Sequence, residues 1–232
     1  MAKLKRLLVP QFWRIPKKEY KWTVSPRPGP HKKFESIPLQ IIVRDILKLG
    51  ETGKEAKVII HNGEVLVDGK KRKDHAYPAG LMDVVAIPRI KKYFRVVPFS
   101  RGLKLSEISE EESKKKICRI NGKSIVRKGK MQLNLHDGKN ILVDKDVYKT
   151  GDSVLIEVPA QKILEHVKLE KGSSGLIIKG KNSGKHVGIK EILVARSREP
   201  NKIICEIEGK EVEVREDYVL VVGKKEPLVA VE

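Results

Sequence analysis

Cationic side chains at helical spacing are the residues of this chain best suited to a chemical task, and that task is phosphate binding. Lys54, Lys57 and His61 follow one another three and four positions apart, so they share one face of a predicted helix. Arg44 and Lys48 are four positions apart on a predicted helix that precedes it. Cations on adjacent elements of a small rigid unit can neutralise successive phosphates of a nucleic-acid backbone.

Two short helices are expected to position these cations. Apolar residues at helical spacing predict the first one, and they are Leu39, Ile42, Val43, Ile46 and Leu47. Gly50 stands where a left-handed C-cap would follow that helix. Thr52, three residues before Glu55, forms a capping-box pattern that begins a second helix. This second helix is expected to end at Asn62-Gly63.

A strand and a tight turn complete the unit. Asp68-Gly69 is a hairpin signal, and the cationic run Lys70–Lys73 follows it. Two helices followed by HNGEVLVDGK resemble the S4-type RNA-binding fold, and this resemblance implies an RNA-binding module. An ordinary solvated surface is the alternative, because residues 39–87 carry eight basic and seven acidic groups.

The charge of the whole chain lies mainly on either side of this unit. The chain has 232 residues and a formal net charge of +19. Residues 1–38 carry ten basic and two acidic groups, and residues 88–130 carry fourteen and four. Such a balance indicates polyanionic partners. A membrane surface is disfavoured, because neither a spanning apolar run nor an amphipathic helix with an aromatic face is evident. The only cysteines, Cys118 and Cys205, suggest a reduced cytoplasmic protein.

The first 38 residues read as a basic extension. Prolines at positions 10, 16, 26, 28 and 30 forbid a long helix, and the apolar content is too low for an independent core, so we expect RNA to order the segment. Trp13, Tyr20 and Trp22 are interleaved with cations, as in segments that stack on unpaired bases. Anchoring of each tryptophan on the following domain is the favoured alternative. Residues 25–31 are expected to form an extended strap.

Short strands and turns dominate the rest of the chain. Strands are expected at Met131–His136, Lys139–Val143 and Ser153–Val158, and together they predict one or two small barrels. A short charged stretch, residues 106–116, could be helical. Four hairpin signals accompany the strands, namely Asn121-Gly122, Asp137-Gly138, Thr150-Gly151-Asp152 and Glu208-Gly209.

One glycine-rich loop stands out in this half. Gly175–Ile192 reads GLIIKGKNSGKHVGIKEI and looks like a KOW motif, a β-loop-β element of ribosomal proteins and transcription elongation factors. Its glycine-flexed backbone would let cations approach phosphates closely, although a well-formed turn is the alternative. A nucleotide-binding P-loop is excluded, because Asn182 occupies the Ser/Thr position and the flanking segments are strands.

Catalytic patterns are weak throughout. The six histidines show no metal-ligand spacing, and no nucleophile-elbow motif is present. Asp68 and Asp83 could form a carboxylate pair, but an Asp in a hairpin turn already has a structural reason. We therefore expect no enzyme, no cofactor, no metal and no small-molecule substrate.

The order of the motifs points to one family. A basic segment with RLLVPQFWRIPKKEYKW and PGPH, the S4-type unit, a β domain and GKNSGKHVG together resemble the ribosomal protein S4e family, in its archaeal form because the chain ends soon after residues 217–223. The resemblance implies an α+β, multi-domain fold: a basic Pro-rich N-terminal extension (1–38), a small helical S4-type RNA-binding domain (39–88), a central β-rich domain (89–170) and an SH3-like KOW barrel with C-terminal strands (171–232).

The function implied is that of a structural constituent of the cytoplasmic small ribosomal subunit. It would bind small-subunit rRNA, help its 5′ region to fold and contact neighbouring ribosomal proteins. The alternative is a mobile RNA-binding or transcription-associated factor. Phosphate contacts are also expected from the run Lys114–Lys116. The residues predicted to contact RNA are Lys3, Lys5, Arg6, Trp13, Arg14, Lys17, Lys18, Lys21, Trp22, Arg27, His31, Lys32, Arg44, Lys48, Lys54, Lys57, His61, Asn62, Lys70, Lys71, Arg72, Lys73, Arg89, Lys91, Lys92, Lys181, Asn182, Lys185 and His186.

Overall fold

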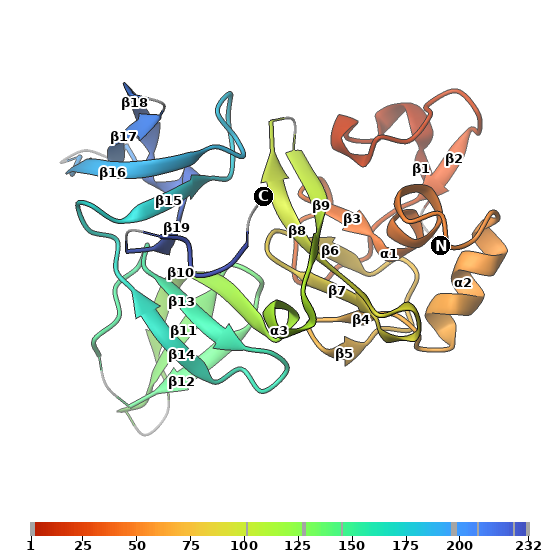
Figure 1. Ribbon diagram of the computed structural model, residues 1–232, viewed down its shortest axis with the longest axis horizontal. Coiled ribbons are helices and arrows are strands. Elements are labelled where there is room, and N and C mark those ends of the chain that lie inside the picture. Colours follow the sequence, from red (N-terminus) through yellow and green to blue (C-terminus); the bar gives the residue numbers. More distant parts are fainter. Residues whose placement is uncertain are drawn as a thin grey trace. The chain divides into compact units, whose positions relative to one another are not determined.

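The computed structural model describes residues 3–100, 102–126, 129–144, 146–195, 199–207, 209–224 and 226–230 (Figure 1). Glu208 of the expected fourth hairpin and the side chain of Lys3 lie outside this description. The chain divides into two compact units. Unit 1 comprises Met1–Val97 with Arg101–Lys114, and unit 2 comprises Pro98–Ser100 with Lys115–Glu232.

Unit 1 is built around a five-stranded sheet of order β5-β4-β7-β8-β9. Its strands are β4 (Leu66–Val67), β5 (Lys70–Lys71), β7 (Val84–Ile87), β8 (Lys92–Phe99) and β9 (Gly102–Ile108). Two small antiparallel pairs, β1 (Lys3–Lys5) with β2 (Trp22–Val24) and β3 (Ser36–Pro38) with β6 (Pro78–Gly80), accompany it. The helices are α1 (Leu39–Ile41), α2 (Gly53–His61) and α3 (Glu110–Ser113).

The first predicted helix is present, but not as a regular α-helix. Three α-helical residues of α1 continue as a π-helix, Ile42–Ile46, in which the Leu47 amide donates to the Ile42 carbonyl five residues back. A wider turn shifts the register of the later side chains. Ile46 is therefore exposed, whereas Ile42 and Val43 are buried as the apolar spacing predicts.

The expected C-cap at Gly50 is wrong. Lys48 takes the left-handed conformation instead, with φ of 52°, and Gly50 does not. Gly50 has a different reason to be glycine, because a Cβ there would lie 3.2 Å from the Ala56 nitrogen. The loop thus passes close to the start of α2.

The capping box that begins α2 is confirmed. The Thr52 hydroxyl accepts a hydrogen bond from the Glu55 amide at 3.2 Å, and the Glu55 carboxylate accepts one from the Glu51 amide. The Thr52 hydroxyl also donates to Oε1 of Glu55 at 2.8 Å, and this bond, followed by the one from the Glu51 amide, lowers the pKa of Glu55. Ala56 and Ile60 of α2 are buried in the core that also contains Val67 of the sheet. The helix is therefore fixed at its N-terminus and along its apolar face.

We expect Thr52→Ala to lower the free energy of unfolding by about 1 kcal/mol, because it removes the cap of α2. Chemical denaturation of the full chain measures this, with hydrogen exchange of the α2 amides as a local readout. Thr52→Ser keeps the oxygen and serves as the control. An equal loss in the serine variant would contradict the assignment of this cap.

The N-terminal extension packs into the hydrophobic core of unit 1. Leu4, Val9, Trp13 and Ile15 belong to the same hydrophobic core as residues of α1, α2 and the sheet. The prediction that the segment lacks a core of its own agrees with this. The expectation that RNA orders it is wrong, because the core it joins is supplied by the protein.

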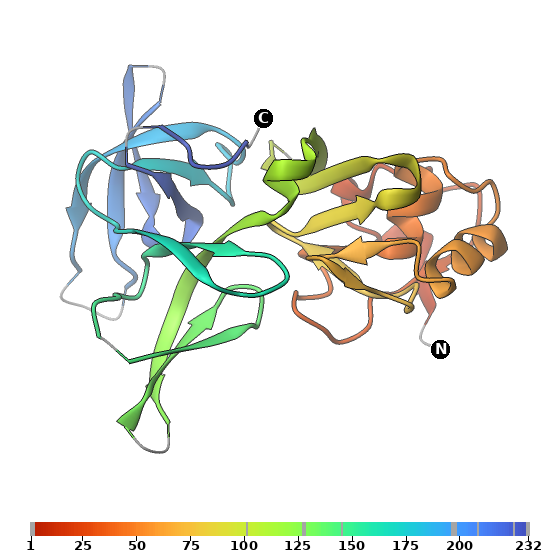
Figure 2. The same ribbon diagram turned by 60° about the horizontal axis from the view of Figure 1, so that its bottom comes forward.

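Unit 2 contains two five-stranded antiparallel sheets (Figure 2). One has the order β12-β11-β10-β13-β14, with β10 (Lys115–Ile125), β11 (Met131–Leu135), β12 (Asn140–Val143), β13 (Ser153–Glu157) and β14 (Ile163–Val167). The other has the order β18-β17-β16-β15-β19, with β15 (Ser174–Ile177), β16 (His186–Leu193), β17 (Lys202–Ile207), β18 (Lys210–Arg215) and β19 (Val219–Gly223). Each sheet has its own hydrophobic cluster.

Three of the expected hairpin signals lie in described parts of unit 2, and one of them forms the predicted hairpin. Asp137-Gly138 turns the chain between β11 and β12, with Gly138 at a φ of 74°, as predicted. Thr150-Gly151 is a turn, but the strand after it, β13, pairs with β10 rather than with β12. Asn121-Gly122 is not a turn at all. It lies inside β10, where the pairing register shifts between Ile120 and Gly122.

This bulge has a clear role in β10. The strand pairs with β13 over Lys115–Arg119 and with β11 over Ile120–Ile125, so it changes partner at the bulge. Bulges bend and twist a strand locally, and this allows one long strand to serve both neighbours.

The structure is mostly β with few helices, and it has more than one unit, as the sequence predicts in outline. The short charged stretch is helical only in the four residues of α3, since β9 takes up its first three residues and β10 its last two. Among the described residues no helix is long and apolar enough to span a membrane.

Candidate nucleic-acid interface

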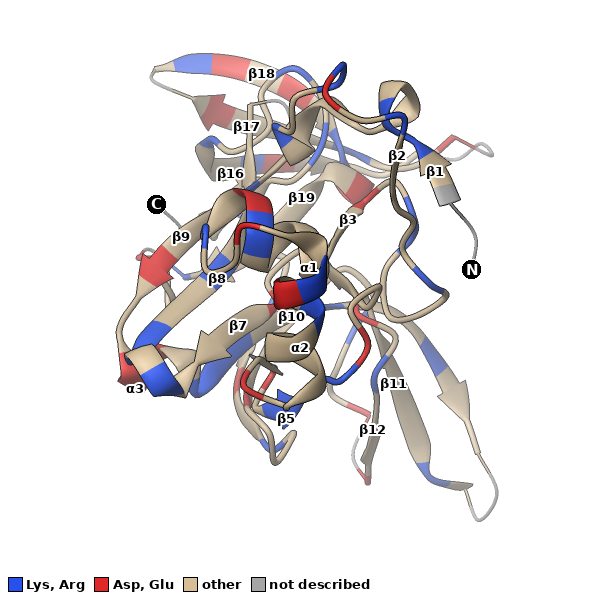
Figure 3. Cartoon of the chain, turned by 90° about the vertical axis from the view of Figure 1, so that its right-hand side faces the viewer, with Lys and Arg blue, Asp and Glu red and all other residues tan. Residues whose placement is uncertain are grey.

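The cations of α2 border a shallow groove in unit 1, which we call the α2 groove. It has a volume of about 410 Å³ and is lined by Lys57, Val58, His61, Asn62, Lys73 and His75. The helix brings the first four together, and the segment after β5 adds the other two. Blue segments for Lys and Arg are visible on α2 and at β5 in Figure 3.

Electrostatics favour an anion in the α2 groove. Lys57, His61 and Lys73 are exposed, and no carboxylate lines the groove. Burial and the nearby charge of Lys57 lower the pKa of His75, although Asp74 acts in the opposite direction. Lys57 and Lys73 supply the positive charge of the groove. The groove can therefore hold a phosphate of a nucleic-acid backbone.

The turn after β4 presents further cations. Asp68 and Gly69 both have positive φ, 49° and 68°, as the predicted tight turn requires. Lys70 and Lys71 beyond it are exposed on β5. Arg72 differs, because its guanidinium lies 4.5 Å from the centre of the Tyr77 ring and is partly buried.

A second and larger groove lies between the N-terminal extension and the π-helix, and we call it the extension groove. Its volume is about 1200 Å³. It is lined by Arg6, Arg14, Pro16, Glu19, Tyr20, Lys21, Trp22, Arg44, Asp45, Lys48, Gly50, Glu51, Thr52 and Gly53. The extension contributes Arg14, Lys21 and Trp22, whereas the end of the π-helix and the loop after it contribute Arg44 and Lys48. The groove thus joins predicted residues that are far apart in the sequence.

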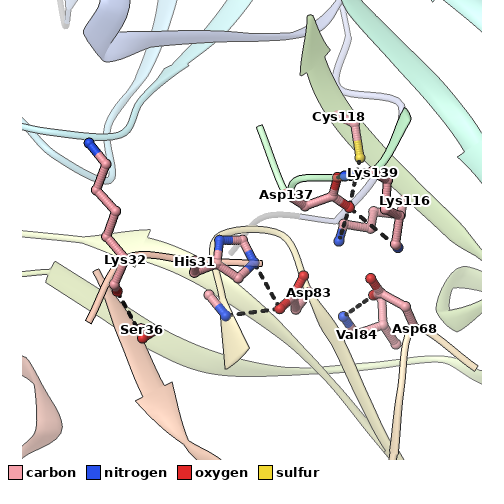
Figure 4. A network of polar contacts seen from close by, with 11 residues as sticks. His31, Lys32, Ser36, Asp68, Asp83, Val84, Lys116, Cys118, Asp137 and Lys139 are labelled. Carbon is pink, nitrogen blue, oxygen red and sulfur yellow. Dashed lines mark hydrogen bonds and ion pairs between the residues drawn. The ribbon is translucent and has the colours of Figure 1, made fainter. Parts of the chain in front are cut away.

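Three predicted residues have buried side chains in unit 1 and make contacts within the protein. Trp13 is 1% exposed and donates from Nε1 to the Ser36 carbonyl, so it is the anchor that the sequence favoured. Arg6 is buried, donating to the Pro16 carbonyl and to Glu19. The His31 side chain is buried against Asp83, 2.9 Å from Nε2 (Figure 4). Each packs or pairs within the protein.

Three predicted arginines form ion pairs at the surface of unit 1. Arg44 contacts its neighbour Asp45 at 2.8 Å, Arg27 contacts Asp74, and Arg89 contacts Glu64, the latter two at 3.1 Å. Exposed pairs of this kind contribute little to stability, so a phosphate can compete for the arginine. The predicted residues that are exposed are Lys5, Arg14, Lys17, Lys18, Lys21, Trp22, Arg27, Lys32, Lys48, Lys54, Lys57, His61, Asn62, Lys70, Lys71, Lys73, Arg89, Lys91, Lys92, Lys181, Lys185 and His186.

Lys116 in unit 2 is a correction to the predicted run Lys114–Lys116. Its side chain is 0% exposed, and its Nζ lies 2.8 Å from Oδ2 of Asp137, which is equally inaccessible (Figure 4). Lys139 approaches the same oxygen at 3.3 Å. The alternation of a strand places Lys116 on the inner face of β10, so it holds the core together and does not meet phosphate.

Both aspartates of the considered carboxylate pair have structural roles in unit 1. Oδ1 of Asp68 accepts from the Val84 amide at 3.1 Å. Oδ2 of Asp83 accepts from the Gly80 amide at 2.9 Å and contacts His31. These contacts agree with the expectation that Asp in a turn has a structural reason.

The glycine-rich loop of unit 2 has the predicted β-loop-β form. It connects β15 to β16 and is closed by hydrogen bonds from Ser183 to Gly180 and from Lys185 to Asn182, both 3.2 Å. Gly184 has a φ of 87°, and a Cβ there would lie 2.9 Å from the Phe99 Cα. The loop is therefore packed as well as turned, and it leaves Lys181, Lys185 and His186 exposed.

Three cationic residues of unit 1 have a left-handed backbone conformation. Arg14, Lys48 and Lys91 have φ of 52°, 52° and 53°, although none is a glycine. This conformation costs an ordinary residue about 1 kcal/mol or more, and such costs cluster at functional sites. All three belong to the residues predicted to contact RNA.

We expect Lys91→Gly to raise the free energy of unfolding by about 1 kcal/mol, because it removes that cost at the end of the 3-10 helix Pro88–Ile90. If Lys91 contacts a phosphate, the same change lowers the salt slope of RNA binding by about 1. Chemical denaturation and binding titrations measure the two effects. Lys92→Gly is the control, since Lys92 lies in β8 and should lose stability instead. If both changes lower the free energy of unfolding, the left-handed conformation of Lys91 does not carry the expected cost.

Comparisons with known proteins cover nearly the whole chain. The model described as Ribosomal family S4e matches residues 90–163, the RS4NT (NUC023) domain matches 2–34, and the S4 domain matches 37–85. The small ribosomal subunit protein eS4 of Methanothermobacter thermautotrophicus is 48% identical over 229 residues, which are 98% of this chain and 94% of that protein. The chain belongs to the ribosomal S4e family.

Other members of the S4e family agree with this assignment. The eS4 protein of Archaeoglobus fulgidus is 45% identical over 96% of this chain and 93% of its own length. The crystal structure of the 30S ribosomal protein S4e from Thermoplasma acidophilum superposes with a TM-score of 0.70 at 29% identity, over 82% of this chain and 95% of that one. The predicted family is therefore confirmed, with archaeal relatives.

The segments matched in the S4e family coincide with the grooves of unit 1. All residues that line the α2 groove lie in the segment matched by the S4 domain. The extension groove is lined by residues of that segment and of the segment matched by the RS4NT domain. Sequence reasoning missed His75, Glu51 and Gly53 as lining residues. The capping box at Thr52 was a signal for the last two, because it locates the start of α2, whereas nothing in the sequence links His75 to Lys57.

Proposed function

We propose that this chain is a structural constituent of the cytoplasmic small ribosomal subunit, where it binds rRNA and helps its 5′ region to fold. The observation that carries the proposal is the similarity over nearly the whole chain to proteins named small ribosomal subunit protein eS4. The α2 groove and the surrounding exposed lysines support it, because they supply the positive potential that a phosphate backbone requires.

The proposed mechanism is neutralisation and positioning. Exposed cations of unit 1 bind phosphates, and those of the loop Gly180–Lys185 in unit 2, proposed to be a KOW element within an SH3-like barrel, add a separate contact. RNA shape, rather than base edges, supplies most of the specificity. Neighbouring small-subunit proteins are the proposed protein partners. We further propose that the chain is not an enzyme and that its domains are residues 1–38, 39–88, 89–170 and 171–232.

A charge-matched comparison tests this proposal. The triple variant Lys54→Gln, Lys57→Gln, Lys73→Gln removes three exposed cations from α2 and its groove. The slope of log affinity for small-subunit rRNA against log salt concentration should decrease by about 3 in magnitude. Filter binding or fluorescence titration measures it.

The control removes the same charge elsewhere. Lys162→Gln, Lys171→Gln and Lys210→Gln alter three exposed lysines of unit 2 that lie outside the predicted set. An equal change of slope in both triple variants would show that net charge, and not this surface, governs binding. Retention of wild-type binding by the α2 variant would count against the proposed interface.

A further inference from the structure

The extension groove differs in chemistry from the α2 groove. Both are lined by cations, but the extension groove has the large rings of Tyr20 and Trp22 among its lining residues, whereas the rings of the α2 groove are the imidazoles of His61 and His75. Its volume of about 1200 Å³ exceeds that of pockets for drug-sized molecules, which reach roughly 1,000 Å³. A nucleotide with part of its backbone fits such a space.

The two rings are unusually accessible. Tyr20 is 66% exposed and Trp22 is 43% exposed, whereas Trp13 of the same segment is 1% exposed. The Arg6 guanidinium lies 5.3 Å from the Tyr20 ring centre, and the Lys21 ammonium lies 5.6 Å from that of Trp22. Each ring therefore has a cation on it and still exposes much of its surface, which is an arrangement suited to base stacking beside phosphate.

The carboxylates of the groove are mostly neutralised. Glu19 is paired with Arg6 at 3.3 Å, and Asp45 with Arg44 at 2.8 Å. Arg14, Lys21 and Lys48 add further positive charge, against Glu51. The balance at the groove favours an anionic ligand.

Backbone conformation supports a built site. Arg14 and Lys48 both line the groove, one from the extension and one from the loop after the π-helix, and both have a φ of 52°. The π-helix itself is a rare geometry that occurs often at functional sites. Two costly local conformations thus place cations at the same groove.

We propose that the extension groove binds an unpaired nucleotide of RNA. Its base stacks on Tyr20 or Trp22, and its phosphates contact Lys21, Arg14 and Lys48. The α2 groove, which lacks tyrosine and tryptophan, holds backbone phosphate only. This inference rests on the proposed RNA-binding function and adds single-stranded RNA as the class of ligand at one defined site.

Tryptophan fluorescence of the full chain tests the inference. Trp13 is buried, so acrylamide quenching reports chiefly on Trp22. A mixed-sequence single-stranded hexaribonucleotide should protect Trp22 from quenching. The same strand annealed to its complement, and inorganic tripolyphosphate, should leave the quenching unchanged, because they supply charge without an unpaired base.

Variants locate the stacking surface. Tyr20→Ala should weaken hexaribonucleotide binding roughly 5- to 150-fold, the cost of losing one stacked base, and Tyr20→Phe should retain the affinity. Phe34→Ala is the matched control, because Phe34 is 58% exposed with the Lys33 ammonium 5.5 Å from its ring centre but does not line the groove. It should bind as the wild type does.

The outcomes separate this inference from the proposed function. The nucleotide site alone is overturned if Tyr20→Ala binds the hexaribonucleotide as the wild type does and the hexaribonucleotide leaves acrylamide quenching of Trp22 unchanged, provided that small-subunit rRNA still binds with a steep salt slope. Equal losses in the Tyr20 and Phe34 alanine variants also overturn it. Failure of the wild-type chain to bind either RNA overturns both.

Discussion

Raising the salt concentration from 50 to 200 mM should weaken binding to small-subunit rRNA by roughly a factor of 10³ or more. This follows if about six to ten phosphates are neutralised, since each contact releases condensed counterions. The exposed lysines and arginines of unit 1 are numerous enough to supply these contacts without help from unit 2. Affinity measured at several salt concentrations gives the slope directly.

A shallow slope would contradict this expectation. The release of only one or two counterions would mean that the exposed lysines remain in solvent when RNA is bound. A steep slope for tRNA and small-subunit rRNA alike would retain the electrostatic term but remove the preference for rRNA. The measurement therefore needs both RNAs at each salt concentration.

Replacing Lys116 should cause a large loss of stability. We expect Lys116→Ala to lower the free energy of unfolding by about 3–5 kcal/mol, because it leaves the Asp137 carboxylate buried without its main partner. Chemical denaturation measures the loss. Lys123→Ala is the control, since Lys123 pairs with Asp146 at the surface and should cost no more than about 1 kcal/mol.

The Lys116–Asp137 pair also predicts a pH dependence. Burial would raise the pKa of Asp137, but the charges of Lys116, His136 and Lys139 outweigh it and lower that pKa well below the usual range. The native state therefore binds fewer protons than the unfolded state, so this stability is present above about pH 4 and is lost as the pH falls further. In Lys116→Ala the pKa of Asp137 should rise and acid unfolding should begin at a higher pH. Similar losses in the Lys116 and Lys123 variants, or unchanged acid unfolding, would contradict this account of the pair.

Local signals in the sequence predicted much of unit 1. The capping box at Thr52, the left-handed pair Asp68-Gly69 and the end of α2 before Gly63 each depend on hydrogen bonds between near neighbours in the chain. The loop between β15 and β16 was also readable, because glycines at fixed spacing constrain the backbone. Interactions of this range are encoded within a few residues.

Signals that depend on distant partners could not be read from the sequence. Asn121-Gly122 has the chemistry of a turn, yet pairing of β10 with strands on both sides makes it a bulge. Lys116 looks like part of a solvated run until Asp137 is placed beside it. Likewise, His31 meets Asp83 and Trp13 meets Ser36 only after the chain has folded.

The candidate site, too, was predictable only where it depends on neighbouring residues in the sequence. The exposed lysines of α2 followed from helical periodicity. The extension groove could not be predicted in this way, because the segments that line it are far apart in the sequence. Within this basic, aromatic segment Arg6 and Trp13 are buried, whereas Tyr20 and Trp22 are exposed and line the extension groove.

Cross-linking in native cells, followed by sequencing of the bound RNA, tests the central claim most directly when it is combined with sucrose-gradient sedimentation. We expect cross-links concentrated in the 5′ region of small-subunit rRNA and sedimentation of the protein with small subunits. Cross-links spread over nascent transcripts or tRNA, with the protein at the top of the gradient, would contradict the claim and indicate a mobile factor.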